Sequence, residues 1–290
     1  MPLPPHRPGN RPEERIAVVT GTSSGFGLLT AVTLSKRGFR VVAAMRDLSR
    51  AGDLRSKAGL EGVSERIVYE RLDVTDLQAI PRVVAGVLAA YGRIDVLVNN
   101  AGFAVGGFVE EVPMDDWRLQ METNFFGLVA LTKAVLPAMR EQGSGLIVNI
   151  GSVSGRIGFP GYAPYAASKF AVAGFSESLR HEMSPYGVRV ALIEPGAYRT
   201  PIWRKGLEHI RSSAGSPYDE KLQAVLRYSR RAADQAPDPQ EVAELVGRIA
   251  VSDSGGFRFP VGRGSRLLLW GKALLPWNWL ERLIARALSR

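Results

Sequence analysis

Short apolar runs alternate with longer segments of helical character along most of this chain. The runs that predict buried strands are residues 15–20, 39–45, 66–72, 93–98, 145–150, 188–193 and 256–260. Helices are expected at about residues 28–37, from 76, and at 114–140, 163–183 and 237–251. Apolar strands that are separated by helices indicate an α/β fold, with a parallel, doubly wound sheet and right-handed crossovers.

A single domain is expected at residues 15–263. Three segments, one of them inside this domain, do not follow the alternation of strands and helices. Residues 1–14 hold five prolines and no apolar period, so we expect a flexible arm. Residues from about 197 to 236 are polar and prone to form helix, which is typical of a mobile lid over a substrate pocket. Residues 264–290 are expected to form an amphipathic helical extension.

Composition excludes several classes of function. The 290 residues include no cysteine, so the chain has no disulfide and no thiolate site, which fits a reducing cytoplasm. Its three histidines have no metal-ligand spacing, and we expect no metal. The net charge of +9 is spread along the sequence and is not clustered with aromatic residues, which favours a solvated basic surface over nucleic-acid binding.

A glycine-rich turn stands between the first strand and the first helix. It has the spacing Gly-x-x-x-Gly-x-Gly, and the residues we assign to a cofactor site are Gly21, Ser23, Ser24, Gly25, Phe26 and Gly27. Glycines let backbone N–H groups approach a pyrophosphate, and a helix N-terminus favours its negative charge. Strand, turn and helix in this order predict a dinucleotide site.

The end of the second strand indicates which dinucleotide is bound. Arg46 offers a cation for a 2′-phosphate, so NADP is expected, with NAD as the alternative if Asp47 turns inward. Asp73, after the third strand, either meets the adenine or caps the following helix. The small residues Asn100, Ala101 and Gly102 follow the fourth strand and permit a cofactor to lie against the backbone. Further along, the hydroxyl of Thr200 is a plausible partner for the nicotinamide amide.

Candidate chemistry gathers after the strand at residues 145–150. Ser152 follows that strand, and Tyr165 and Lys169 lie one turn apart on the next helix. A cation beside a phenol lowers its pKa, which suits a general acid/base, while Ser152 can hydrogen-bond a substrate oxygen. This set suits reduction of a carbonyl or oxidation of an alcohol. Asn124 is either a buried amide that satisfies local backbone groups or also the holder of a water near Lys169.

These motifs stand in one order: the glycine turn, Asn99–Gly102, the serine, tyrosine and lysine set, and Pro195-Gly196. With them the chain resembles the short-chain dehydrogenase/reductase family from about Arg15 to Pro260. The resemblance implies a Rossmann-type sheet, a nicotinamide cofactor contacted also by Pro195 and Gly196, and a homo-oligomer. It implies that Tyr165 is the acid/base and that Lys169 binds the nicotinamide ribose. It further implies that Ser152 orients the substrate oxygen and that Asn124 continues a proton relay.

Within that family the chain is similar to the hydroxysteroid and retinol dehydrogenase branch and its bacterial members. This similarity implies a hydrophobic alcohol or carbonyl substrate of steroid, retinoid or long-chain type. The residues expected to line its pocket, unless they belong to the core, are Phe103, Val105, Phe108, Phe159, Tyr162 and Trp203. Two other classes stay open: a catalytically silent NADP-binding regulator and a peripheral membrane protein of the same fold.

The tail carries an apolar stripe at helical spacing, formed by Leu280, Leu283, Ile284, Ala287 and Leu288. Charged residues interrupt every run well short of the roughly twenty apolar residues that a bilayer span requires. We expect one amphipathic helix that packs on the protein or on an oligomer partner. The alternative is a membrane surface, because three tryptophans precede the stripe.

Overall fold

Seven parallel strands form the centre of the computed structural model, which describes residues 14–202, 206, 210–252 and 255–288. Their order is β3-β2-β1-β4-β6-β7-β9. In chain order they are β1 (Ile16–Thr20), β2 (Arg40–Met45), β3 (Ile67–Arg71), β4 (Val96–Asn99), β6 (Gly145–Ile150), β7 (Val188–Pro195) and β9 (Arg258–Val261). The expected doubly wound α/β sheet is confirmed. Except for Glu14, the expected arm at 1–14 lies outside the described residues.

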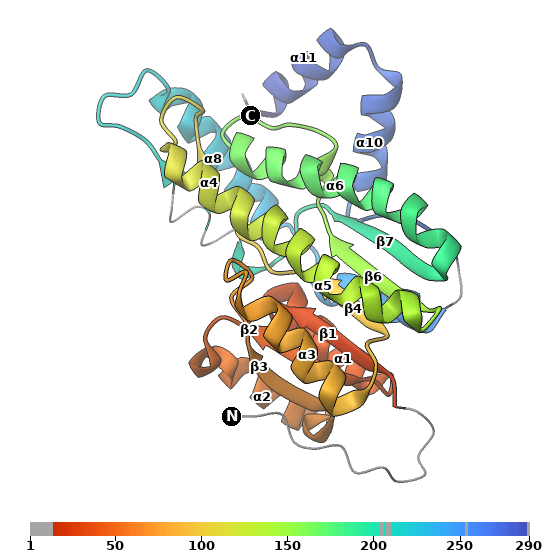
Figure 1. Ribbon diagram of the computed structural model, residues 1–290. Coiled ribbons are helices and arrows are strands. Elements are labelled where there is room, and N and C mark those ends of the chain that lie inside the picture. Colours follow the sequence, from red (N-terminus) through yellow and green to blue (C-terminus); the bar gives the residue numbers. More distant parts are fainter. Residues whose placement is uncertain (1–13, 203–205, 207–209, 253–254, 289–290) are drawn as a thin grey trace.

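Helices cover both faces of this sheet (Figure 1). They are α1 (Gly25–Lys36), α2 (Gly52–Leu60), α3 (Ala79–Tyr91), α4 (Met114–Met121), α5 (Gly127–Glu141), α6 (Ala163–Met183), α8 (Asp219–Asp234), α9 (Gln240–Val251), α10 (Ser265–Leu274) and α11 (Trp277–Leu288). The central strands are buried on both faces, which explains why their sequences are mostly apolar and do not alternate between apolar and polar residues.

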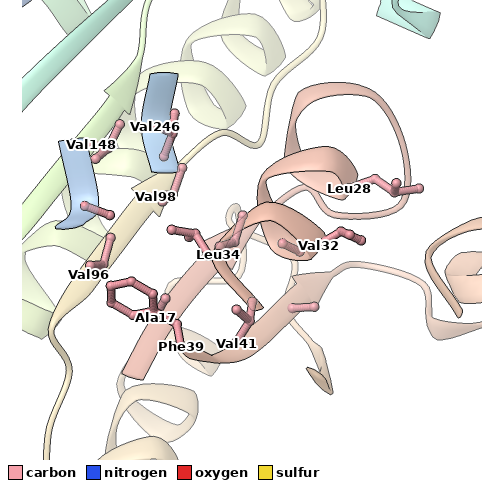
Figure 2. Packing of buried hydrophobic residues seen from close by; sticks show 14 of the residues in the cluster. Ala17, Leu28, Val32, Leu34, Phe39, Val41, Val96, Val98, Val148 and Val246 are labelled. Carbon is pink, nitrogen blue, oxygen red and sulfur yellow. The ribbon is translucent and has the colours of Figure 1, made fainter. Parts of the chain in front are cut away.

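The sheet separates two apolar cores. Under α1 and α9, Leu34 and Val246 pack with Val98 and Val148 of β4 and β6 (Figure 2). On the opposite face, α3, α5 and α6 bring their buried side chains against the other sides of the same strands. Alternate residues of each strand therefore belong to different cores, and the carboxyl ends of the strands are left to carry functional groups.

Three of the expected helices differ from the sequence-based expectation. The first helix begins at Gly25, inside the glycine turn, because glycine accepts the positive φ of +58° found there. The long helix expected at 114–140 is divided into α4 and α5 by a π-helical turn, Glu122–Phe126. The tail forms two helices, because Pro276 forces the preceding Leu275 into extended backbone with ψ of 141°.

The segment expected to be a lid contains α8, and it is packed on the rest of the protein. Leu222 and Val225 of α8 are buried, and a short strand β8 (Ile210–Arg211) pairs in parallel with β5 (Gly106–Gly107). The lid is thereby tied to the loop that follows β4, on the side of the sheet where the strands end.

Candidate active site

The glycine turn requires its glycines for space as well as for conformation. Gly21 has φ of +70°, a left-handed value that L side chains rarely adopt. A Cβ added at Gly27 would lie 2.4 Å from both Gly21 O and Asn100 Nδ2. The first turn of α1 is thus pressed against the end of β4, the strand beside β1.

The N-terminus of α1 is suited to hold the diphosphate of a dinucleotide. Ser24 is the N-cap of α1 but makes no side-chain capping bond, so the N–H groups of the first turn remain available to an anion. The Phe26 ring packs edge-on against Tyr198, with centroids 5.5 Å apart. Gly25 lies against Thr200, so the turn meets the loop after β7.

The Asn100 side chain holds the turn in place. Its Nδ2 donates to Thr20 O at 2.8 Å and to Gly21 O at 3.2 Å. Thr20 Oγ1 in return accepts from the backbone N–H groups of Asn100 and Ala101, each at 3.0 Å. Sequence reasoning missed Thr20, and its only signal is a hydroxyl at the end of an apolar strand. Gly102 lies beside Asn124, whose Oδ1 would be 3.1 Å from an added Cβ.

Arg46 and Asp47, the two charged residues that follow β2, differ in their side-chain partners. Asp47 Oδ1 accepts from Ser49 N at 2.9 Å and from Ser49 Oγ at 2.7 Å. These bonds hold the pKa of Asp47 below its ordinary value. Arg46 is exposed and makes no side-chain bond or ion pair with the part of the chain that the structure describes. Because the Asp47 carboxylate already accepts hydrogen bonds from Ser49, the exposed Arg46 cation is better suited to bind a 2′-phosphate than this pair is to bind a ribose hydroxyl.

Asp73 does not cap the next helix. Its Oδ1 accepts from Thr75 N at 3.0 Å and from Thr75 Oγ1 at 2.8 Å, which closes a local turn after β3. Asp76 instead accepts from the N–H groups of Gln78 and Ala79, where α3 begins. The contact of Asp73 with adenine stays a prediction.

Ser152, Tyr165 and Lys169 come together at the carboxyl end of β6. Ser152 is buried, and its hydroxyl lies close enough to the Tyr165 side chain to lower the pKa of that phenol. Lys169 lies one turn further along α6, with Nζ 5.7 Å from the Tyr165 ring centroid. Nζ donates to Ile150 O at 2.8 Å, so the last residue of β6 fixes the ammonium. This grouping can polarise a substrate oxygen and exchange a proton with it.

Burial governs the acidity of this set. It raises the pKa of the Tyr165 phenol, and the hydrogen bond with Ser152 opposes the rise. Burial also lowers the pKa of Lys169 to about 8. The tyrosine pKa was expected to fall, and in the protein alone it is raised instead, because loss of hydration outweighs the stabilisation of the phenolate. A protonated phenol is the form that donates to a carbonyl oxygen.

Asn124 is carried by the π-helical turn, a feature often found at functional sites. Its Oδ1 accepts from Phe103 N at 3.0 Å, and its Nδ2 donates to Phe103 O at 2.9 Å and to Ser168 Oγ at 3.1 Å. Ser168 Oγ donates in turn to Tyr165 O at 2.7 Å. Asn124 therefore satisfies local backbone groups and is also joined to α6 through Ser168. Sequence reasoning missed Ser168, although it directly precedes Lys169.

The loop after β7 is held by contacts with Ser152, β9 and α10. Ser152 Oγ donates to Pro195 O at 3.5 Å, and Gly196 N donates to Val261 O at 2.9 Å. A Cβ at Gly196 would lie 2.5 Å from Ser265 Oγ, so α10 packs directly on this loop. The buried Glu194 lies just before it, with Oε1 3.1 Å from Arg258 Nη1. Sequence reasoning did not identify this ion pair.

Three of the six residues expected to line a substrate pocket contact the lid. The Phe108 ring stacks on Tyr218 with centroids 4.7 Å apart, and Phe159 stacks on Tyr228 at 5.0 Å. Tyr162, at the start of α6, is buried and hydrogen-bonds Ser229 of α8 at 3.0 Å. Val105 is buried too, whereas Trp203 lies outside the described residues. Aromatic pairs thus join the lid to the segments beside the catalytic set.

Similar proteins share both the sequence and the fold. Residues 15–210 match the short chain dehydrogenase family. The uncharacterized oxidoreductase YusZ of Bacillus subtilis is 45% identical over 95% of this chain and 99% of its own length. A 3-ketodihydrosphingosine reductase of Bacteroides thetaiotaomicron is 33% identical over 93% of this chain and 96% of its own. Retinol dehydrogenase 5 of mouse is 32% identical, with 94% and 88% covered.

Solved structures agree with these relatives. A short-chain dehydrogenase from Streptomyces avermitilis superposes with a TM-score of 0.79, at 32% identity, over 95% of this chain and 96% of that one. A metagenomic short-chain oxidoreductase in complex with NADP has a TM-score of 0.67 at 29% identity, with 85% and 95% covered. A short-chain dehydrogenase/reductase from Burkholderia phymatum in complex with NAD has 0.73 at 28% identity, with 86% and 89% covered. The chain therefore belongs to the short-chain dehydrogenase/reductase family of NAD(P)-dependent oxidoreductases.

Proposed function

We propose that this protein transfers hydride between NADP(H) and a hydrophobic alcohol or carbonyl compound, with Tyr165 as the general acid/base. The observation that carries the proposal is the grouping of the buried Ser152 with Tyr165 and the buried Lys169 at the carboxyl end of β6. A hydroxyl, a phenol and an ammonium group, which differ in acidity, lie together at the carboxyl end of β6. Ligands bind at this end of the strands in open α/β sheets.

Each residue has a distinct role in the reaction. When bound, the nicotinamide supplies or accepts the hydride. Ser152 donates a hydrogen bond to the substrate oxygen, and Tyr165 gives that oxygen a proton in reduction or removes one in oxidation. Lys169 presents a cation that favours the phenolate once the proton has left. Asn124 holds α6 in register through Ser168.

The choice of NADP over NAD is supported by the different partners of two neighbouring residues. The carboxylate of Asp47 is engaged by Ser49, whereas the guanidinium of Arg46 is exposed at the end of β2. A ribose 2′-hydroxyl calls for a free carboxylate, and a 2′-phosphate calls for a cation. The uncapped N-terminus of α1 would receive the diphosphate of either cofactor.

A hydrophobic substrate is supported by the apolar character of the surroundings. The residues between the catalytic set and the lid include two stacked aromatic pairs. Two relatives carry names of enzymes that act on retinol and on 3-ketodihydrosphingosine. We therefore place this protein's substrates among retinoid-like, steroid-like and long-chain compounds.

A homo-oligomer is supported by apolar side chains that remain exposed on the helices beside the catalytic set. Leu119 on α4 is 50% exposed and Phe126 in the π-helical turn is 46% exposed. Large apolar groups in such places often mark an interface. Light scattering of the wild type against Phe126→Ser tests this part of the proposal, which fails if both are monomers.

The experiment that tests the function is an oxidation screen with NADPH and with NADH. The panel holds retinoid, steroid and long-chain aldehyde or ketone substrates, with small ketones for comparison. We expect turnover with NADPH and a hydrophobic carbonyl, absent in Tyr165→Phe. Preference for NADH would overturn the cofactor assignment, and activity confined to small polar ketones would overturn the substrate class.

A further inference from the structure

The tail has an apolar surface that the protein itself does not cover. On α10, Leu267, Trp270 and Leu274 recur at helical spacing and are 78%, 67% and 73% exposed. The opposite side of the same helix carries Ser265 and Leu269, which are buried. One face of α10 thus belongs to the core, and a second apolar face points outward.

The last helix repeats this arrangement. Leu280 of α11 is only 4% exposed, and α11 packs against α8, so this part of the expected packing on the protein is present. Trp277 and Trp279 are each 60% exposed, and Leu283 is 49% exposed. We define the tail surface as Leu267, Trp270, Leu274, Trp277, Trp279 and Leu283. It contains three of the five tryptophans in the chain.

Charge around the tail surface has one dominant sign. Residues 264–290 carry the cations Arg266, Lys272, Arg282, Arg286 and Arg290 against a single carboxylate, Glu281. Glu281 Oε1 already accepts from the Trp277 indole at 2.7 Å. Arg266 and Arg282 are exposed next to the apolar residues. Tryptophan mixed with arginine is typical of segments that lie at the boundary between lipid headgroups and acyl chains.

We propose that α10 and α11 dock this protein on the surface of an anionic lipid bilayer. Within the described ranges no helix is both long enough and apolar enough to cross a membrane, so the contact is superficial. The indoles and leucines would enter the headgroup boundary while the arginines meet phosphates. A second copy of the chain is the less suitable occupant, because two identical tail surfaces facing each other would bring their arginines together.

The body of the protein holds these helices in place. Ser265 Oγ donates to Val261 O at 3.0 Å, and Lys272 Nζ donates to Arg156 O in the loop after the catalytic serine. Figure 1 shows α10 and α11 as a bent pair at one end of the molecule. Because their inner faces are already packed, the outer face can bind lipid without unfolding any part of the chain.

Vesicle sedimentation of the full chain tests the proposal. Vesicles of phosphatidylglycerol with phosphatidylcholine are compared with pure phosphatidylcholine at about 0.1 M salt, where exposed charges still act over roughly 10 Å. We expect the wild type to sediment with the anionic vesicles only. The variant with Trp270→Ser and Leu274→Ser should lose roughly tenfold or more in partitioning, and Arg282→Glu with Arg286→Glu should lose the preference for anionic lipid.

The matched control changes equally exposed apolar residues elsewhere. Leu60 and Leu77 are 89% and 53% exposed, and Leu60→Ser with Leu77→Ser should sediment as the wild type does. NADPH binding, measured in parallel, checks that every variant is folded. The proposal is overturned if the wild type stays in the supernatant with anionic vesicles, or if the Trp270 and Leu274 variant binds them equally well. Loss of a dimer in that variant, without vesicle binding by the wild type, would assign the tail surface to a second copy.

Discussion

Asp47 is turned toward Ser49, whose backbone N–H and hydroxyl donate to Oδ1 at 2.9 and 2.7 Å. The sequence left open whether this carboxylate would face a cofactor ribose. In the structure it closes a short turn after β2, so the neighbouring Arg46 is the group presented at the strand end.

Arg46→Ala should therefore weaken NADP(H) binding and leave NAD(H) binding unchanged. A charge-assisted bond to a phosphate contributes about 1.5–3 kcal/mol, so a loss of about ten- to hundredfold is expected. Fluorescence titration with both cofactors measures it. Arg140→Ala, an exposed arginine in the last turn of α5, is the control. Equal losses for NADPH and NADH would contradict the assignment.

Tyr165→Phe should lower kcat by roughly a hundredfold or more with little change in cofactor affinity, because only the transferable proton is removed. Tyr162→Phe is the matched control. Its hydroxyl bonds Ser229 of the lid, so its removal should retain most activity and cost about 1 kcal/mol of stability. Steady-state kinetics decide the matter, and wild-type turnover by Tyr165→Phe would rule out the proposed acid/base.

Lys169 should give the folding stability a distinct pH dependence in the protein without added cofactor. Burial lowers its pKa from 10.5 to about 8, so between these values the unfolded chain binds more protons than the native one. The free energy of unfolding then rises with pH across that window, by at most about 1.4 kcal/mol per unit.

Urea unfolding of wild type and Lys169→Met at about pH 8 and pH 10 measures this contribution. The free energy of unfolding of the wild type, relative to that of Lys169→Met, should be greater at the higher pH. The same comparison with Lys133→Met, at an exposed position on α5, should not change with pH. A difference that does not vary with pH would contradict the buried environment assigned to Lys169.

Gly27→Ala should destabilise the glycine turn and weaken binding of either cofactor. Its Cβ would lie 2.4 Å from a backbone oxygen and an amide nitrogen, so the turn must shift, at a cost of about 1–3 kcal/mol. Gly174→Ala on α6 is the control, because its Cβ would meet nothing within 4 Å and should stabilise the helix by up to about 1 kcal/mol. Thermal melting with and without NADPH separates the two effects.

Arg258→Met should destabilise the protein more at high pH than at low pH. It leaves the carboxylate of Glu194, which is 1% exposed, with Arg156 alone. Burial already raises the pKa of Glu194, and protonation at low pH relieves the unpaired charge, so the loss grows as pH rises.

We expect Arg258→Met to lower the free energy of unfolding by about 3–5 kcal/mol near pH 8 and by less near pH 5. Arg37→Met, which breaks the more exposed pair with Glu244, should cost about 1 kcal/mol or less at either pH. Chemical unfolding at both pH values is the measurement. Equal losses for the two variants would show that Glu194 does not depend on Arg258.

The sequence by itself determined the sheet, the glycine turn and the spacing of the catalytic set, because each follows from interactions that are local in the chain. Strands buried on both faces must be largely apolar, as β1 and β4 are up to the polar residues Thr20 and Asn99 at their ends. A tyrosine and a lysine four residues apart on one helix must share a face, as Tyr165 and Lys169 do.

Only the tertiary structure decided what depends on neighbours that are distant in the chain. It pairs Asn124 with Ser168 and Glu194 with Arg258, and it turns the Phe26 ring toward Tyr198. Packing against α8 buries one stripe of the tail and leaves another exposed, although both are apolar in sequence. A pattern of apolar residues indicates which faces of a helix can be buried. The arrangement of the other elements in space decides which of those faces are buried.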